Sequence, residues 1–397
     1  MATIDPKDRA DFRSRAYCEQ EEAWRMCEDI AEGTLRIREK KGAYLPKFEG
    51  EDPIDYEARI KMTFVNNHYA QALEDHVGLV FANPPKLSDD VPPALEELLE
   101  NVDGEGTHFD VFQQEAMLLA LDHGHVLILT DYPNVVPGSS LAEAREQELR
   151  PYLVMYTAKQ AISWRIAKVG GITMLEQIVL EETFLDVDGL YGEREIKQYR
   201  TFKHEMTRND KGVVIQRGAV TWALHERDPE SPHGLTLIDE DVLLDPDGKD
   251  LPRIPIRVVY GGRKLGALRS KPHLLELAMT NIQETQVESD YAAVMHKCNV
   301  PTPIFVGRGK RKPGQAIQMG SGIDLPIGGS AMYLEPSGAA LNATRNRLTD
   351  IRAQIQRQGG FVREAAKQMT ATEIALYARQ RNARLVRAVR SLQDGME

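Results

Sequence analysis

The sequence has little cysteine and no long apolar run. Three cysteines in a chain of 397 residues give no disulfide framework, which suits a reducing cytoplasm. No apolar run reaches the roughly 18 residues that a membrane-spanning helix needs. The N-terminus, which carries Asp5, Lys7 and Arg9, also lacks the apolar core of a signal peptide. We therefore expect a soluble protein that makes no membrane contact and stays where it is made.

An excess of positive charge is also missing. Lys and Arg number 49 against 60 Asp and Glu, which gives a formal net charge of −11. Tight binding of nucleic acid depends on Lys and Arg side chains that neutralise phosphates. The charge balance therefore argues against a tight DNA or RNA binder, although it leaves open a surface past which DNA slides.

The chain does contain a clear order of helical and strand-rich segments, and its length allows two or three domains. The predicted helices cover residues 6–40, 54–81, 93–99, 107–122, 272–297, 341–358 and 370–393. The predicted strands cover residues 125–131, 152–156, 162–166, 175–184, 196–202, 212–216, 219–224 and 257–260. The middle third is thus a mainly antiparallel β module joined by hairpins. We expect an α+β fold.

The glycine-rich segment 261–266, GGRKLG, has some likeness to a phosphate-binding loop. A P-loop needs the pattern G-x-x-x-x-G-K-[ST] between a strand and a helix, so that backbone N–H groups and one lysine hold the phosphates. The spacing here differs and the helix is missing. We interpret the segment as a turn after the strand 257–260.

His123 and His125 flank Gly124, and Asp122 and Asp131 lie nearby. No further cysteine or histidine pattern completes a metal site. We therefore interpret one histidine as a cap at the C-terminus of a helix and the other as facing solvent. Acidic residues also cluster at 181–182, 239–241, 245 and 247, but one sequence cannot show whether they converge, and we interpret them as solvated loops and strand edges. These patterns predict no catalytic residue, no cofactor and no metal site.

The densest basic cluster comprises Arg308, Lys310, Arg311 and Lys312. It lies at the tip of a β insert predicted at residues 300–336, and glycines flank it. Such a cluster can contact phosphates or an acidic partner protein. A mobile, soluble loop tip is the alternative.

The two helices on either side of this insert are polar over most of their circumference. The helix at 272–297 has a narrow, interrupted apolar stripe, and the helix at 341–358 has a seam of Leu341, Leu348, Ile351 and Ile355. Helices of this kind are hard to stabilise in the core of a monomer. We predict that they stand side by side in an oligomer, with an ordinary surface helical hairpin as the alternative.

Four stretches of the chain resemble tailed-bacteriophage portal proteins, in particular a portal-like family catalogued as a domain of unknown function. The first stretch runs from YLPKFEG at 44–50 through DYEAR at 55–59 and VGLVF at 77–81 to NPP at 83–85. The second is the apolar strand from Gly124 to the DYP at 131–133. The third is the helix through Tyr291 to the PTP at 301–303, and the last combines LPIGG at 325–329, YLEPSG at 333–338 and TATEI at 370–374.

The resemblance implies a division of the chain into the parts of a portal subunit. Residues 1–270 would form the wing, 271–298 and 338–358 the two stem helices, and 299–337 the clip. Residues 359–369 would form a tunnel loop, and 370–397 would begin a helix toward the crown. Because the sequence ends soon after that helix, the crown is short or absent, or the sequence is truncated.

The resemblance also implies a function without catalysis. The chain would form a ring of twelve subunits at one capsid vertex of the virion, after assembly in the cytoplasm of the host bacterium. Double-stranded DNA would pass through this channel during packaging and ejection without sequence specificity. The implied partners are the terminase large subunit, a head–tail adaptor, and the major capsid and scaffolding proteins. The rival interpretations are another virion structural protein, such as an adaptor or minor head protein, and a metal-dependent hydrolase hidden in the acidic β module.

Specific residues follow from this interpretation. Carboxylates in a tunnel repel DNA phosphates, so that DNA passes without sticking. We therefore expect Glu276, Glu284 or Glu288 to face the tunnel, and Gly359, Gly360, Arg363 and Lys367 to belong to the loop that touches DNA. Arg308, Lys310, Arg311 and Lys312 are the residues expected in clip docking.

Overall fold

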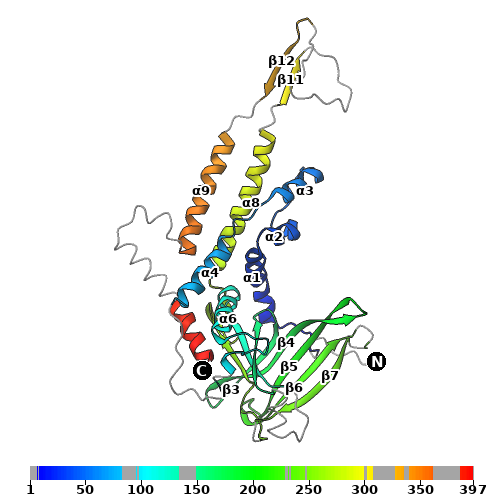
Figure 1. Ribbon diagram of the computed structural model, residues 1–397, viewed down its shortest axis with the longest axis vertical. Helices are drawn as coiled ribbons and strands as arrows, with labels where there is room; N and C mark the ends of the chain where they lie inside the picture. Colours follow the sequence, from blue (N-terminus) through cyan, green and yellow to red (C-terminus); the bar gives the residue numbers. More distant parts are fainter. Residues whose placement is uncertain are drawn as a thin grey trace, which may run out of the picture. The chain divides into compact units, whose positions relative to one another are not determined.

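The computed structural model describes residues 7, 9–82, 95, 98–133, 149–228, 231, 234–245, 248–298, 302–306, 327–334, 339–360 and 385–396. They form an α+β fold, as predicted, with helices and antiparallel sheets (Figure 1). The chain divides into two compact units. Unit 1 contains Met1–Ala31, Tyr69–Ala278 and Gly359–Glu397, and unit 2 contains Glu32–His68 and Met279–Gln358.

The largest sheet of unit 1 has five antiparallel strands in chain order (Figure 1). The strands are β3 (Ala161–Val169), β4 (Ile172–Asp188), β5 (Gly192–Arg208), β6 (Val214–Arg227) and β7 (Leu235–Leu243). Glycines with φ of +89°, +76° and +75° at positions 171, 189 and 212 provide the left-handed backbone at the first three turns. The predicted hairpin connections are therefore confirmed.

Two differences from the predicted strands have local causes. The segments 212–216 and 219–224 belong to one strand, β6, because Gly218 continues the strand instead of ending it. Strand β7 is absent from the predicted set because three consecutive acidic residues, Asp239, Glu240 and Asp241, hide its apolar alternation. The carboxylates at 239–241 thus lie on an edge strand, as expected. Glu181 and Glu182 instead lie on β4 inside the sheet and are half-buried, and Glu182 pairs with Arg200 at 3.0 Å, so for these two the expectation of a solvated edge is wrong. Residue 247 lies outside the described residues.

A smaller sheet of unit 1 pairs β2 (Tyr152–Thr157), β1 (Val126–Asp131) and β8 (Ile256–Val259), in that order and antiparallel. Strand β1 is central and almost entirely buried. Its Leu127 and Leu129 share one apolar core with Ile178 and Phe202 of the five-stranded sheet. The short hairpin of β9 (Arg263–Gly266) and β10 (Arg269–Lys271) follows.

The helices of unit 1 are α1 (Arg15–Glu32), α4 (His68–Val80), α6 (Phe109–His123) and a helix at residues 385–396. The predicted helix 6–40 is two helices, because Gly33 has a φ of +81° and separates α1 from α2. Helix α6 ends as predicted at Gly124, whose φ is +87°. A Cβ there would lie 2.6 Å from Ser270 Oγ, so this position also requires glycine for space.

Unit 2 contains a set of helices and one hairpin. The elements are α2 (Thr34–Lys40), the 3₁₀ helix η2 (Lys41–Ala43), α3 (Pro53–Met62), α8 (Leu275–Cys298) from Met279 onward, α9 (Ala339–Gly359), and the antiparallel strands β11 (Thr302–Val306) and β12 (Ser330–Leu334). The two long helices and the hairpin between them in sequence agree with the predicted helix, β insert and helix. Of the predicted apolar seam on α9, Leu348, Ile351 and Ile355 are buried, whereas Leu341 is only half-buried.

The long helix predicted over residues 54–81 is wrong, because the chain leaves the helix at Thr63. This residue has an extended backbone, with φ −61° and ψ 131°. Its hydroxyl donates to the Arg59 carbonyl at 2.8 Å at the end of α3 and is also hydrogen-bonded to Ser289 of α8 at 2.8 Å. A new helix, α4, begins at His68, and residues 63–67 are free to contact α8.

The compact units cut across the predicted segment 1–270, since residues 32–68 belong to unit 2. The interpretation of the segments as wing, stem, clip and tunnel loop stays a prediction. The described part of the last predicted helix, residues 385–393, is helical, and the helix continues to residue 396.

Candidate functional site

The candidate site of this chain is the polar face that α8 buries inside unit 2. Thr280, Asn281, Glu284, Thr285 and Ser289 are each at most 5% exposed. Steps of three and four residues, from 281 to 284 and 285 and from 285 to 289, place them on one side of the helix. A buried helix face of this kind requires a polar partner for each side chain.

The segment that follows α3 supplies several of these partners. Asn281 Nδ2 donates to the Asn66 carbonyl at 2.9 Å, and Asn66 Nδ2 donates to Glu288 at 2.9 Å. Thr63 Oγ1 and Ser289 Oγ are hydrogen-bonded at 2.8 Å. The helix break at Thr63 therefore has a structural consequence, because it brings backbone and side-chain groups of residues 63–67 to α8.

Arg59 fixes the segment 44–53 against the same unit. Its guanidinium is 3% exposed, donates to both carboxylate oxygens of Glu51 at 2.9 Å, and lies over the Phe48 ring at 4.5 Å. It also donates to the Pro46 carbonyl at 2.8 Å. Residues 44–53 are therefore held in unit 2 by a buried ion pair and its hydrogen bonds.

Arg352 of α9 is the link between the two long helices. Its Nε donates to Glu284 at 2.7 Å, and its Nη2 lies 3.3 Å from Glu288. His68 Nε2 lies 3.4 Å from the second oxygen of Glu284. One buried carboxylate of α8 thus meets a cation from α9 and a histidine at the start of α4.

The electrostatics of Glu284 favour its ionised form. Burial by itself raises the pKa of this carboxyl, but the hydrogen bonds and positive charges of His68 and Arg352 outweigh it and lower the pKa below 4.5. The same contacts raise the pKa of Arg352. The Glu284–Arg352 pair is therefore charged at neutral pH and positions α8 against α9.

The glutamates predicted to face a tunnel have three different environments. Glu276 is exposed and forms an ion pair with Lys271 at 2.7 Å. Glu288 is partly exposed and is shared between Arg352 and Asn66. Glu284 is 1% exposed within the chain, so it holds α9 in place and does not present its charge to a channel.

The other predicted site residues are only partly within the described structure. Gly359 is buried at the end of α9, and Gly360 has a φ of +70°, as expected for a glycine that ends a helix. Arg363, Lys367, Arg308, Lys310, Arg311 and Lys312 lie outside the described residues. Sequence reasoning missed Thr63, Asn66 and Arg352 as partners of α8. The polar stripe at 280, 281, 284, 285 and 289 is the signal that could have found such partners.

Of the interpretation of the two histidines of unit 1, one part is confirmed and one is wrong. His123 lies in the last turn of α6, as predicted for the histidine at a helix C-terminus, but neither histidine faces solvent, because both are buried. His123 is 3% exposed and lies 3.2 Å from Asp122, and His125 is 1% exposed. His125 Nδ1 shares a hydrogen bond with Ser270 Oγ at 2.8 Å, and burial lowers the pKa of His125 to about 3. Both histidines therefore belong to the core of unit 1. Within the described residues, no group of three or more His, Cys, Asp or Glu side chains could hold a metal ion.

The cysteines near this core allow a direct test of burial. Cys27 is 0% exposed, and burial raises its pKa to about 12, whereas Cys18 is exposed. At pH 8 on the order of one Cys27 thiol in ten thousand is then ionised, and the thiolate is the reactive form. We expect iodoacetamide to label Cys18 in the native protein and Cys27 only after denaturation, as peptide mass spectrometry would measure. Equal labelling of both cysteines in the native protein would contradict this burial.

No helix in the described ranges is long and apolar enough to cross a membrane.

The comparisons with known proteins concern the segment that contains both long helices. Residues 273–397 match the model of a family described as "Domain of unknown function (DUF4055)". This range begins just before α8 and includes the β11–β12 hairpin, α9 and the helix at 385–396. No curated protein matches the sequence.

Proposed function

We propose that this chain is the subunit of a tailed-bacteriophage portal, a ring at one capsid vertex through which double-stranded DNA enters and leaves. The observation that carries the proposal is the order of α8, the β11–β12 hairpin and α9 within residues 273–397. It is the order of stem helix, clip and stem helix in the portal-like family that the sequence resembles. The proposal includes the virion as the location and no enzymatic activity.

The contacts of unit 2 support such a role in physical terms. A channel wall needs helices that keep their relative position while DNA moves past them. Helix α8, of 24 residues, extends about 36 Å, and α9, of 21 residues, about 32 Å. The Glu284–Arg352 pair fixes these helices side by side, and the segment 63–67 braces α8. In this proposal Glu284 stabilises the arrangement of the helices in the channel wall, and exposed carboxylates repel the DNA phosphates.

The acidic balance of the chain fits the same role. Tight contacts with phosphates release counterions and would oppose the movement of DNA. A net charge of −11 favours passage over retention. The proposed partners are further copies of the chain in a ring of twelve, the terminase large subunit, a head–tail adaptor, and the major capsid and scaffolding proteins.

Ring formation by the purified chain is the decisive test. We expect native mass spectrometry to find a closed oligomer, and negative-stain images to show rings with a central hole. The measurement should be made across a tenfold range of protein concentration, because a specific ring keeps one subunit number while non-specific aggregates do not. A stable monomer throughout that range would overturn the proposal.

A further inference from the structure

Unit 1 has an apolar hairpin tip that the fold itself does not cover. Strands β4 and β5 meet in the turn 189–191, where Leu190 is 83% exposed and Tyr191 94% exposed. Val187, beside the turn, is 77% exposed. Turns normally carry polar residues and glycine, and exposed apolar clusters mark interaction surfaces.

The backbone conformation of this turn requires glycine at two positions. Asp188 pairs with Gly192, and a Cβ on Gly192 would lie 2.3 Å from the Asp188 carbonyl oxygen. Gly189 has a φ of +76°. The glycines therefore hold a tight turn whose two remaining residues, Leu190 and Tyr191, are presented to solvent.

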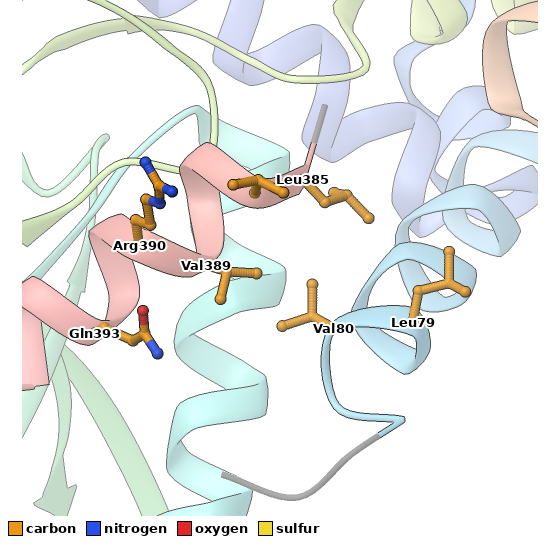
Figure 2. Close-up of a pocket in the computed structure, with 7 residues that line it drawn as sticks. Leu79, Val80, Leu385, Val389, Arg390 and Gln393 are labelled. Atoms are coloured by element: carbon orange, nitrogen blue, oxygen red, sulfur yellow. The ribbon is translucent and has the colours of Figure 1, made fainter. Parts of the chain in front are cut away.

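Unit 1 also contains an apolar groove, which could receive apolar side chains such as those at the hairpin tip. It has a volume of about 300 Å³ and lies between the end of α4 and the helix at 385–396. Figure 2 shows Leu79 and Val80 on one side and Leu385 and Val389 on the other. This volume is at the lower end of the range for binding pockets, about 300–1,000 Å³, and suits one or two large side chains.

The charges of the two surfaces are opposite. Residues 186–195 of the hairpin contain four carboxylates and one guanidinium, and that guanidinium, Arg194, already pairs with Asp186 at 3.2 Å. Among the described residues that line the groove, Arg390 is the one charged group, and Gln393 adds a polar amide (Figure 2). An acidic apolar tip thus matches an apolar groove that carries one arginine.

We propose that the β4–β5 tip of one subunit inserts Leu190 and Tyr191 into the α4/C-terminal-helix groove of a second copy of this chain. The chain's own groove does not hold the tip, since Leu190 and Tyr191 are almost fully exposed. A contact between two tips would oppose like charges, so the tip pairs with a groove, and tip-to-groove contacts can run head to tail from one subunit to the next. Head-to-tail contacts close into rings when the rotation permits. The inference therefore rests on the proposed ring and identifies one of its contacts.

Disulfide trapping tests this contact in the full chain. In a background with Cys18→Ser and Cys298→Ser, Tyr191→Cys and Val386→Cys are combined in one chain and the protein is oxidised mildly. Val386 lies in the groove and is 45% exposed. On a denaturing, non-reducing gel we expect a ladder of linked species beyond the dimer, because each subunit offers one tip and one groove. Either single variant should form rings but show no cross-linked band. A disulfide needs Cα atoms within about 7 Å, so the ladder reports close insertion.

The outcomes separate this contact from the proposed function. Rings without a ladder, or a Tyr191→Cys variant that forms dimers by itself, would overturn the contact and leave the ring proposal standing. Loss of rings in the unmodified chain would overturn the ring proposal instead.

Exchange of the charges at Arg390 and Asp188 is an independent test of the same contact. We expect Arg390→Glu to lower the fraction of rings in native mass spectrometry at least tenfold, and Asp188→Arg in the same chain to restore it. The matched control is Val213→Asp, which places a charge at an exposed apolar residue of a different hairpin and should leave the rings intact. An equal loss in Arg390→Glu with and without Asp188→Arg would contradict the pairing.

Discussion

Replacement of Arg352 by methionine will destabilise the α8–α9 pair by about 2–4 kcal/mol. The cause is Glu284, which is 1% exposed and would remain buried without the cation that lies 2.7 Å away. The loss is smaller than for a fully buried ion pair, because the Arg352 side chain is 46% exposed and water already screens part of the interaction. The long methionine side chain keeps most of the packing of the arginine stem.

Hydrogen exchange is the appropriate measurement for this variant. Its three tryptophans, Trp24, Trp164 and Trp222, all belong to unit 1, so their fluorescence does not report on unit 2. Amide exchange in peptides from α8 and α9 reports the local opening free energy. The matched control is Arg347→Met on the exposed side of α9, for which we expect a change within about 0.5 kcal/mol. Unchanged protection of α8 in Arg352→Met would show that the pair does not hold these helices together.

A double variant distinguishes the buried charge from lost packing. Glu284→Gln removes the charge, so the combination with Arg352→Met should be more stable than Arg352→Met alone. We expect a coupling free energy of about 1–3 kcal/mol between the two positions. If the stability losses of the two single variants simply add in the double variant, the effect of Arg352→Met comes from lost packing of the arginine side chain and not from the buried charge.

The pH dependence of the pair has a definite sign. The folded state lowers the pKa of Glu284 below its ordinary value of 4.5, so the pair stabilises the fold above that pH. Its contribution declines as the pH falls below 4.5 and through the lowered pKa, because the carboxylate becomes protonated. The difference in stability between the natural chain and Arg352→Met should therefore be largest near neutral pH and should shrink in acid.

The local elements of this fold follow from the sequence more closely than their partners do. The glycine at 124, the strand after it and the apolar seam of α9 depend on neighbouring residues, and each is confirmed. The helix break at Thr63 depends on contacts with α8, more than 200 residues away in the chain, which periodicity cannot reveal. The apolar spacing across 54–81 even continues through the break, although Ile54 and Met62 are exposed.

The same limit applies to the candidate site. From the sequence, the polar faces of the two long helices suggested contacts between subunits, because helices that are polar over most of their circumference are hard to stabilise in the core of a monomer. The structure supplies intramolecular partners, Asn66 and Arg352, from two distant segments. Glu284 could be chosen from the sequence as a notable carboxylate, but whether it faces water or an arginine depends on the fold. The likeness of 261–266 to a P-loop failed on spacing, yet its glycines have a role that spacing does not show.

Alanine at Gly262 will destabilise unit 1 by about 3 kcal/mol or more. A Cβ at this position would lie 1.9 Å from the Lys271 carbonyl oxygen, which no rotamer change can relieve because the obstacle is backbone. Gly262 also donates its N–H to the Gly124 carbonyl at 2.9 Å, so a shift of this strand end would break that bond. Gly261 is equally constrained, since its Cβ would lie 2.3 Å from the carbonyl of Ala120 in α6.

Thermal unfolding followed by tryptophan fluorescence measures this loss, because all three tryptophans lie in unit 1. For a unit of 150–250 residues, about 3 kcal/mol corresponds to a fall in Tm of roughly 6–12 °C. The matched control is Gly78→Ala in α4, where a Cβ meets nothing within 4 Å and alanine favours the helix by up to about 1 kcal/mol. Gly266→Ala is a second control in the neighbouring hairpin: its Cβ would make only ordinary contacts at 3.8 Å, so this variant should unfold within about 2 °C of the natural chain. A Gly262→Ala protein as stable as Gly78→Ala would mean that the strand end and β10 do not approach as closely as this fold requires.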